Sequence, residues 1–382
     1  MYRPSLWSPE NPALYTAVSK VYDGETLKDE YTTRFGIRTL EIIPDKGFFL
    51  NGKLTKFKGV CNHHDLGPLG GAVNDAAIRR QIRILKDMGC NAIRTSHNMP
   101  APELVEACDE MGMMLMPESF DEWKSAKMAN GYHKIFDEWV EKDLVNLIRH
   151  YRNNPSVVMW CIGNEVPDQW NGNNGPKLSR MLQDICHRED PTRPVTQGMD
   201  APDAVVNNNM AATMDIAGFN YRPHKYPENY KKLPQQIVLG SETASTVSSR
   251  GVYKFPVTRQ AMKKYDDHQS SSYDVEHCGW SNLPEDDWIW HDDKPWAIRH
   301  LIILIGPVTL LYLASLTLPV CRKTVTISTA AIGIRMKRLF ISFLIGHGRD
   351  GKEKLLRFLS IPTILRQKCL STVRVRVSVP KI

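Results

Sequence analysis

Short apolar segments alternate with amphipathic segments from residue 56 to residue 242. The apolar segments predict strands at 57–61, 91–94, 113–117, 156–165, 194–197, 215–219 and 236–242. Apolar residues at helical spacing predict helices at 75–88, 101–111, 136–151 and 176–188. Such alternation is typical of an α/β fold with a parallel sheet, and seven successive units predict an eight-stranded (β/α)8 TIM barrel. Its eighth unit should follow residue 296.

The first 45 residues have a different pattern. Residues 13–18 and 31–38 predict β strands on either side of an Asp23-Gly24 turn. Two or three strands cannot bury a core by themselves, so we expect the last strands of a β-sandwich that begins upstream. A hairpin with Asn51-Gly52 at its turn follows. We therefore expect a sandwich segment at 1–45, an incomplete barrel at 46–296 and an unrelated tail at 297–382.

The positive net charge is confined to that tail. Residues 297–382 contain 15 Lys or Arg and 2 Asp or Glu, whereas residues 1–296 contain 34 and 40. The net charge of +7 therefore gives no reason to expect nucleic acid as a partner of the barrel. Eight cysteines without a CxxC pair predict buried free thiols. No apolar signal segment follows Met1, and the compartment and the oligomeric state stay open.

Polar and ionisable residues follow six of the predicted strands. They are Asn62-His63-His64-Asp65, Arg94 to Asn98, Glu118 with Asp121, Glu122 and Trp123, Asn164-Glu165, Asn220-Tyr221, and Glu242. A single carboxylate at a strand end is more often a helix cap or an ion-pair partner. Six strand ends that meet at one rim of a barrel favour an active site instead. Two rim carboxylates, Glu165 and Glu242, are the minimum equipment for hydrolysis of a glycosidic bond.

Other residues at the predicted rim allow two interpretations. Adjacent His63 and His64 project to opposite sides of a strand, so one is expected to bind a substrate hydroxyl and the other to be structural. We do not expect them to bind a metal. Trp123 is expected either to pack in the core or to stack on a sugar face.

Four motifs resemble glycoside hydrolase family 2, the family of β-galactosidases, β-glucuronidases and β-mannosidases. They are GVCNHHD at 59–65, IRTSHN at 93–98, NPSVVMWCIGNE at 154–165 and SETAS at 241–245. LWSPENPALY at 6–15 and RFGIR at 34–38 resemble the last strands of the family's immunoglobulin-like domain. The resemblance extends over residues 5–296.

The resemblance implies a retaining, double-displacement mechanism. Glu165 would be the general acid/base and Glu242 the nucleophile, with carboxyl groups about 5–5.5 Å apart. Asn164 would bind the sugar 2-hydroxyl, and Arg94 and Tyr221 would stabilise Glu242. The other expected substrate-binding residues are His64, His97, Asn98, Glu118 and Trp123. No cofactor is implied, although a residue matching Glu118 helps to hold a divalent cation in some relatives.

The SETAS motif resembles β-galactosidases more than β-glucuronidases, so the expected substrate is an oligosaccharide or glycoside with a terminal β-galactosyl group. Two other interpretations stay open. One is a carbohydrate-binding pseudo-enzyme, and the other is a membrane-anchored β-glycosidase of the glucuronidase or mannosidase class.

The tail itself has two competing interpretations. Residues 301–320 carry no charge and are flanked by Arg299 and Arg322-Lys323, a pattern typical of a transmembrane helix. However, the tail can be back-translated with the genetic code and then read one base earlier. In that frame residues 340–353 can become HILPHWTWPGREGK, and residues 305–307 can become WTG. Both strings resemble segments that follow the seventh strand in family 2 β-galactosidases. We therefore expect an out-of-frame tail, loss of the eighth strand and an inactive fragment, and we regard a membrane anchor as the weaker interpretation.

Sequencing of the coding DNA across codons 290–310 tests this interpretation. We expect one extra or one missing base there relative to a frame that encodes the family 2 continuation. An uninterrupted frame, confirmed on independent DNA, would contradict the frameshift and favour a genuine apolar segment.

Overall fold

Eight parallel strands form the central sheet of the protein. The computed structural model describes residues 3–64, 66, 69–222, 225–243 and 301–307. The strand order is β8-β7-β6-β13-β12-β11-β10-β9. Bridges from Leu115 to Val157 and from Glu118 to Cys161 join the two ends, so the sheet closes into a barrel. The strands are β6 (Lys58–His63), β7 (Ala92–Ser96), β8 (Met114–Met116), β9 (Trp160–Asn164), β10 (Val195–Met199), β11 (Ala217–Asn220), β12 (Val238–Glu242) and β13 (Leu301–Pro307). The predicted TIM barrel is confirmed.

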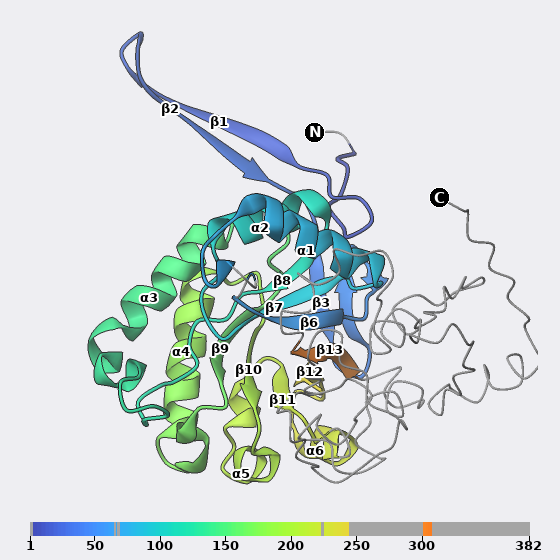
Figure 1. The fold of residues 1–382 in the computed structure, drawn as a ribbon, viewed down its shortest axis with the longest axis vertical. Coiled ribbons are helices and arrows are strands. Elements are labelled where there is room, and N and C mark those ends of the chain that lie inside the picture. Colours follow the sequence, from blue (N-terminus) through green and yellow to red (C-terminus); the bar gives the residue numbers. More distant parts are fainter. Residues whose placement is uncertain (1–2, 65, 67–68, 223–224, 244–300, 308–382) are drawn as a thin grey trace, which may run out of the picture.

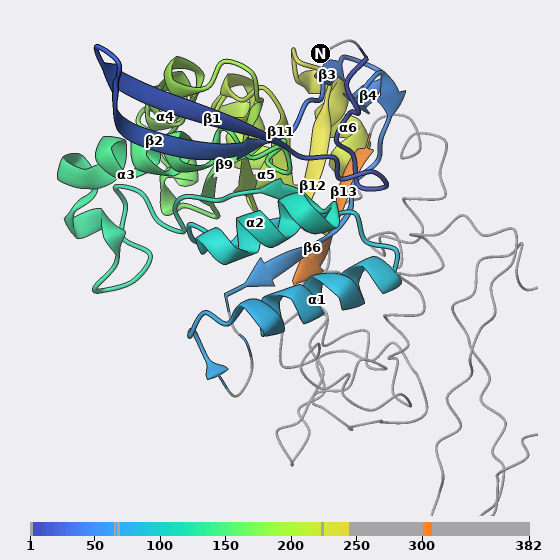
Figure 2. The same ribbon diagram turned by 90° about the horizontal axis from the view of Figure 1, so that it is seen from above.

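The eighth strand position is occupied by β13. Ile303 is aligned with Gly240 of β12 on one side and with Lys58 of β6 on the other (Figure 2). The expectation that the eighth strand would be lost is therefore wrong for this structure. Apolar runs rich in isoleucine and leucine are typical of strands with two parallel neighbours. The segment also lies where the eighth unit was expected, after residue 296.

The predicted membrane segment is a strand where the structure describes it. Residues 301–307 form β13, and residues 308–320 lie outside the described residues. Among the described helices, none has the length and apolar character needed to cross a bilayer. The predicted boundary between the barrel and the tail, at residue 297, also lies outside the described residues and stays a prediction.

Helices cover the outside of the barrel (Figure 1). They are α1 (Asp75–Asp87), α2 (Pro102–Met111), α3 (Phe136–Tyr151), α4 (Gly175–Glu189), α5 (Pro202–Asn207) and α6 (Tyr226–Lys232), with short 3-10 helices η2 (Tyr132–Lys134), η3 (Pro167–Trp170) and η4 (Ala211–Thr213). The four predicted helices are α1 to α4, whereas α5 and α6 were not predicted. Helix α1 begins where the Asn74 side chain accepts a hydrogen bond from the Ala77 N–H, and α2 ends at Gly112 in a left-handed conformation.

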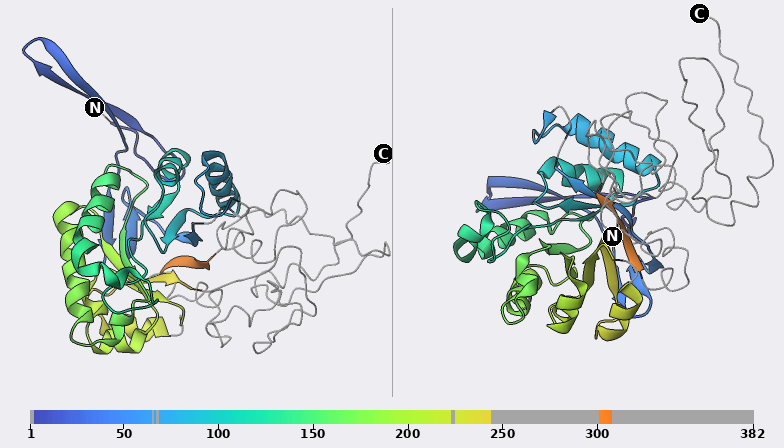
Figure 3. Two further views of the ribbon diagram at one scale, coloured as in Figure 1. Left: turned by 60° about the vertical axis from the view of Figure 1, so that its left-hand side comes forward. Right: turned by 60° about the horizontal axis from the view of Figure 1, so that its bottom comes forward.

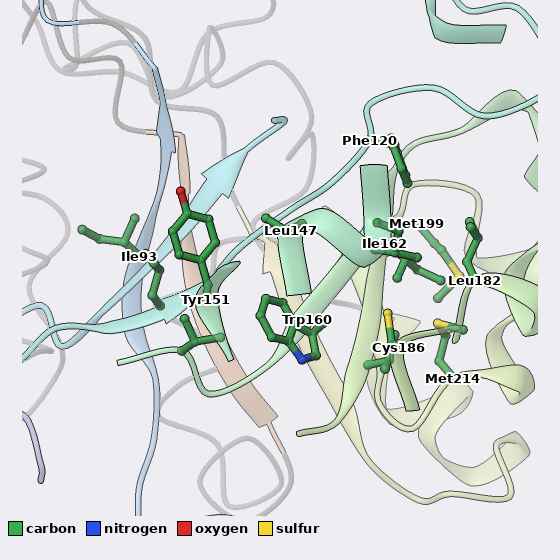
Figure 4. Packing of buried hydrophobic residues seen from close by; sticks show 14 of the residues in the cluster. Ile93, Phe120, Leu147, Tyr151, Trp160, Ile162, Leu182, Cys186, Met199 and Met214 are labelled. Carbon is green, nitrogen blue, oxygen red and sulfur yellow. The ribbon is translucent and has the colours of Figure 1, made fainter. Parts of the chain in front are cut away.

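Two apolar clusters hold the barrel together. The larger cluster lies between strands and helices, where Leu147 of α3 and Leu182 of α4 pack toward Ile162 of β9 (Figure 4). The smaller cluster includes Trp7, Phe48 and apolar residues of the strands. The five cysteines among the described residues are free and buried, as predicted; they are Cys61, Cys90, Cys108, Cys161 and Cys186.

The N-terminal segment forms two small antiparallel sheets. Strands β1 (Tyr15–Asp23) and β2 (Thr26–Phe35) form a hairpin that extends away from the barrel (Figures 1 and 3). Strands β3 (Leu40–Ile43), β4 (Gly47–Leu50) and β5 (Lys53–Leu54) form the second sheet, whose β4–β5 turn is the predicted Asn51-Gly52 hairpin. Arg38 joins this segment to the barrel, because its guanidinium donates to the carbonyl oxygens of Pro155 and Val157 at 2.6 and 2.5 Å.

Candidate active site

Arg94 connects the side chains at the C-terminal rim of the barrel. Its guanidinium is fully buried. Nη1 lies 2.7 Å from Oε1 of Glu242, and Nη2 lies 2.5 Å from Oε2 of Glu118. Nη2 also donates to Oδ1 of Asn164 at 2.9 Å. Burial would lower the pKa of Arg94, but the charges of Glu118 and other neighbours raise it well above its usual value. One cation therefore holds groups from three other strand ends.

Glu118 and His97 form the side of the site next to β7. Glu118 is fully buried, and Nδ1 of His97 lies 2.8 Å from its Oε1. Burial alone would raise the pKa of Glu118, but Arg94 and His97 lower it overall, so Glu118 is an anion at neutral pH. His63 packs edge-on against the His97 ring, with ring centroids 5.0 Å apart. Burial, and then the nearby His97, lower the pKa of His63.

Both oxygens of Glu242 have donors. Arg94 contacts Oε1, and the Tyr221 hydroxyl donates to Oε2 at 2.7 Å. The pairing of β11 with β12 places Asn220 opposite Glu242, which brings Tyr221 beside it. Burial and the charge of Glu242 raise the pKa of Tyr221, so its phenol keeps the proton that it donates. The arrangement matches the requirements of an ionised carboxylate.

Glu165 lies in a different environment, at the end of β9. Its side chain is partly exposed and accepts a hydrogen bond from Nδ2 of Asn220 at 2.8 Å. Burial, and then the charge of Glu242, raise the pKa of Glu165. Its backbone has a φ of 44°, a left-handed conformation that costs free energy for a residue with a side chain and is typical of functional sites. The two carboxyl groups therefore lie at the same rim of the barrel but in different electrostatic environments.

Three of the expected substrate-binding residues differ in their surroundings from the cluster around Arg94. Trp123 is fully buried and donates its indole N–H to the Ile162 carbonyl at 2.8 Å, so the expectation that it stacks on a sugar is wrong. It packs against Gly163, where a Cβ would come within 2.8 Å of the indole nitrogen. His64 is exposed, with Nε2 2.9 Å from the Gly71 carbonyl oxygen, and it is His63 that joins the cluster. Asn98 is exposed next to His97.

Asn220 is a central residue that the candidate set omitted. Its Nδ2 donates to Oδ1 of Asn164 at 2.9 Å as well as to Glu165, and its Oδ1 accepts from the Ser241 hydroxyl at 2.7 Å. It therefore connects the ends of β9, β11 and β12. Its position directly before Tyr221 at a predicted strand end was the available signal. Among the described residues, no group of three or more His, Cys, Asp or Glu side chains is arranged to hold a metal ion.

Comparison with known proteins identifies the class to which this barrel belongs. Residues 42–278 match the description "Glycosyl hydrolases family 2, TIM barrel domain", and residues 1–38 match "Glycosyl hydrolases family 2". The chain belongs to glycosyl hydrolase family 2. This agrees with a TIM barrel that carries two carboxylates at its C-terminal rim.

Two relatives are similar over most of the described residues. The chain is 39% identical over 322 residues to the β-galactosidase BoGH2A of Bacteroides ovatus, which covers 74% of this chain and 38% of that protein. It is 38% identical over 253 residues to a putative β-glucuronidase of Formosa agariphila, covering 66% of this chain and 23% of that protein. The chain thus spans less than two fifths of the length of either relative.

Solved structures have the same fold. A family 2 member from Bacteroides cellulosilyticus matches with a TM-score of 0.64 and 32% identity, over 80% of this chain and 34% of the other. A β-glycosidase from Bacteroides vulgatus matches with a TM-score of 0.61 and 38% identity, over 70% and 34%.

Substitution of Arg94 by Met should strongly destabilise the barrel. The variant leaves Glu118 and Glu242 buried without their cation, so we expect the free energy of unfolding to fall by about 3–5 kcal/mol. Urea unfolding followed by circular dichroism measures the loss. The matched control is Arg34→Met, which removes an ion pair to Glu110 in which Arg34 is about half exposed and should cost about 0–1 kcal/mol. Equal losses in the two variants would contradict the central role of Arg94.

Glu122 has a structural role in the loop between Trp123 and His133. Oε2 accepts from the His133 backbone N–H at 3.0 Å, and Oε1 accepts from Met128 N at 3.0 Å and from Lys127 N. Burial opposes ionisation, but these backbone hydrogen bonds dominate and lower the pKa of Glu122 from 4.5 to about 2.

Glu122 should therefore contribute acid-dependent stability. Because its folded-state pKa is lowered, the contribution is complete above about pH 4.5 and is lost as the pH falls toward about 2. We expect Glu122→Gln to be less stable than the parent at pH 7 and to approach it in stability as the pH falls. Urea unfolding at several pH values between 7 and 3 measures the difference. Glu138→Gln, at an exposed position of α3, is the control, and a pH-independent difference for Glu122→Gln would refute the assignment.

Proposed function

We propose that this protein hydrolyses terminal β-galactosides by double displacement. The observation that carries the proposal is the contrast between the two rim carboxylates. Glu165 is partly exposed and has a raised pKa, which suits a general acid. Glu242 is buried and accepts from Arg94 and Tyr221, which suits an ionised nucleophile.

In the proposed first step, Glu165 donates its proton to the glycosidic oxygen while Glu242 attacks the anomeric carbon. The bond to the aglycone breaks and a glycosyl ester of Glu242 forms. In the second step Glu165, now ionised, takes a proton from water, which attacks the anomeric carbon and releases Glu242. Loss of the negative charge of Glu242 in the ester favours ionisation of Glu165 at this point, because that charge contributes to its raised pKa.

Asn164 is suited to hold the sugar 2-hydroxyl. Its Oδ1 accepts from Arg94 and Asn220, and one N–H of its amide donates to Asp121 at 3.0 Å. The amide nitrogen has two N–H groups, so a second donor can serve the sugar. The contacts to Oδ1 fix which way the amide faces, which supports a positioned donor rather than a freely rotating one.

The charges around the site favour a neutral sugar over a glucuronate. With Glu165 protonated and the histidines left aside, six charged side chains contact Arg94 or Asn164, or act on the pKa of Glu165. They are Glu118, Glu242, Asp121, Asp200, Arg94 and Lys127. Four are acidic and two are basic, and a glucuronate carboxylate would add another negative charge. The similarity to a putative β-glucuronidase keeps that substrate class as the second candidate. The presence of both carboxylates speaks against the carbohydrate-binding pseudo-enzyme.

Hydrolysis of nitrophenyl β-galactoside and β-glucuronide tests the proposal. Both the 382-residue chain and a version with the reading frame restored after about codon 297 should be assayed. We expect the restored version to prefer the galactoside, and the 382-residue chain to be inactive if its tail is out of frame. Glu165→Gln should lower kcat/KM about 10²–10⁴-fold, since it removes general acid/base catalysis. Glu242→Gln should abolish turnover, and Glu138→Gln should have no effect.

Proton NMR of the first product settles the stereochemistry. Double displacement predicts that the β-anomer of galactose forms first and then mutarotates. Initial release of the α-anomer would contradict a nucleophilic role for Glu242, and preferential cleavage of the glucuronide would contradict the assigned substrate.

A further inference from the structure

Trp170 is a large aromatic residue at the rim that the proposed mechanism does not use. It is the last residue of η3, which begins two residues after Glu165. Trp170 is 69% exposed, whereas Trp7, Trp123 and Trp160 are at most 1% exposed. Exposure of an indole to water is unfavourable, and exposed apolar groups beside a cleft often mark a binding surface.

The backbone that carries Trp170 is firmly held. Asp168, which is buried, accepts from the backbone N–H and the hydroxyl of Ser125 at 3.0 and 2.9 Å. Gln169, also buried, donates to Oδ1 of Asp200 at 2.6 Å. Asn208 donates to the Gln169 carbonyl at 2.9 Å. Hydrogen bonds from the loops that follow β8 and β10 therefore hold η3 in place. The exposed indole of Trp170 is attached to this well-bonded backbone.

The short chain between Glu165 and Trp170 limits the distance between these two residues. Five residues separate them, which limits the distance between their Cα atoms to roughly 18 Å even in a fully extended chain. The 3-10 conformation of Pro167–Trp170 shortens it further, because its rise is only about 2 Å per residue. Asp200 supports the same proximity, since it bonds to Gln169 and its charge helps to raise the pKa of Glu165.

Burial differs between the two sides of Glu165. Arg94, Glu118 and Glu242 are 0 to 3% exposed and form the buried side of the site, where attack by Glu242 requires the galactosyl ring. Glu165 protonates the oxygen that links this ring to the aglycone, so the aglycone lies on the open side. Trp170 is on the segment that follows Glu165, and its side chain is exposed to solvent.

We propose that Trp170 is the stacking platform of the aglycone subsite and binds the flat, apolar face of a second sugar or an aryl group. The inference rests on the proposed function, because it takes the orientation of the substrate from the role of Glu165. An indole offers a rigid face of large area to such a ring at a low cost in conformational entropy. The contact would favour substrates with a planar or ring-shaped aglycone over those with a small one.

Trp139 provides a matched control. It is 41% exposed on α3, and the Lys142 ammonium lies 4.5 Å from the centroid of its ring. Its exposure is therefore accompanied by a cation–π contact on its own helix. Removal of this indole changes the tryptophan content in the same way without altering η3.

The test measures binding of three S-linked ligands that a glycosidase does not readily hydrolyse. They are methyl 1-thio-β-galactoside, phenyl 1-thio-β-galactoside and thiolactose. Titration calorimetry of the 382-residue chain and its Trp170→Ala, Trp170→Phe and Trp139→Ala variants gives the dissociation constants. We expect Trp170→Ala to weaken binding of the phenyl ligand or thiolactose about 5–10-fold, consistent with one lost aromatic contact, and to change methyl ligand binding less than about 2-fold. Trp170→Phe should keep most of the affinity, and Trp139→Ala all of it.

Each outcome separates this inference from the proposed function. Selective loss of the phenyl ligand identifies an aryl aglycone, and selective loss of thiolactose identifies a sugar. If all three ligands bind as well to Trp170→Ala as to the parent, or all three lose affinity equally, the subsite is refuted while galactoside recognition stands. If the methyl ligand does not bind but Trp170→Ala still weakens the phenyl ligand, the stacking surface stands and the galactoside assignment fails. Absence of all binding by both the 382-residue chain and the version with the reading frame restored overturns both.

Discussion

The contacts of the buried Arg94 guanidinium hold the rest of the rim in place. It contacts Glu118, Glu242 and Asn164, which follow or end three other strands of the barrel. A buried cation is unfavourable unless its charge is compensated, and the carboxylates of Glu118 and Glu242 compensate the charge of Arg94. The same contacts fix the orientation of Glu242 and of the Asn164 amide. The need to satisfy one buried charge therefore determines where the candidate catalytic groups lie.

Around Arg94, neighbouring polar groups give the carboxyl groups of Glu165 and Glu242 different environments. Glu242 has donors on both oxygens, whereas Glu165 accepts a hydrogen bond from Asn220 and lies closer to solvent. The proposed chemistry needs one protonated and one ionised carboxyl group, and the two acids differ in hydrogen bonding and burial in the sense that this proposal requires. Asn220 contacts Glu165, Asn164 and Ser241, so the two acids and their donors form a single hydrogen-bonded network.

The eighth strand shows how much a barrel tolerates in sequence. Pairing of β13 with β6 and β12 uses backbone groups, which nearly any residue supplies, and its apolar composition suits a position between two parallel neighbours. The expectation that this strand would be lost was based on residue identity at the family motif. Strand pairing does not depend on which side chains are present, so a segment expected to be out of frame can still occupy the position of the eighth strand.

Periodicity in the sequence was sufficient to predict the barrel, its first seven strands and the four longer helices, because a period of two or of 3.6 is a property of local chain geometry. Strand-end positions likewise identified Arg94, Glu118, Glu165 and Glu242. Which neighbour turns inward was decided only by the tertiary structure: His63 rather than His64 joins the cluster, and Trp123 is buried under Gly163. The sequence places these residues near the C-terminal ends of strands. Their burial and their hydrogen-bond partners depend on residues of other strands, and only the closed barrel brings those strands together.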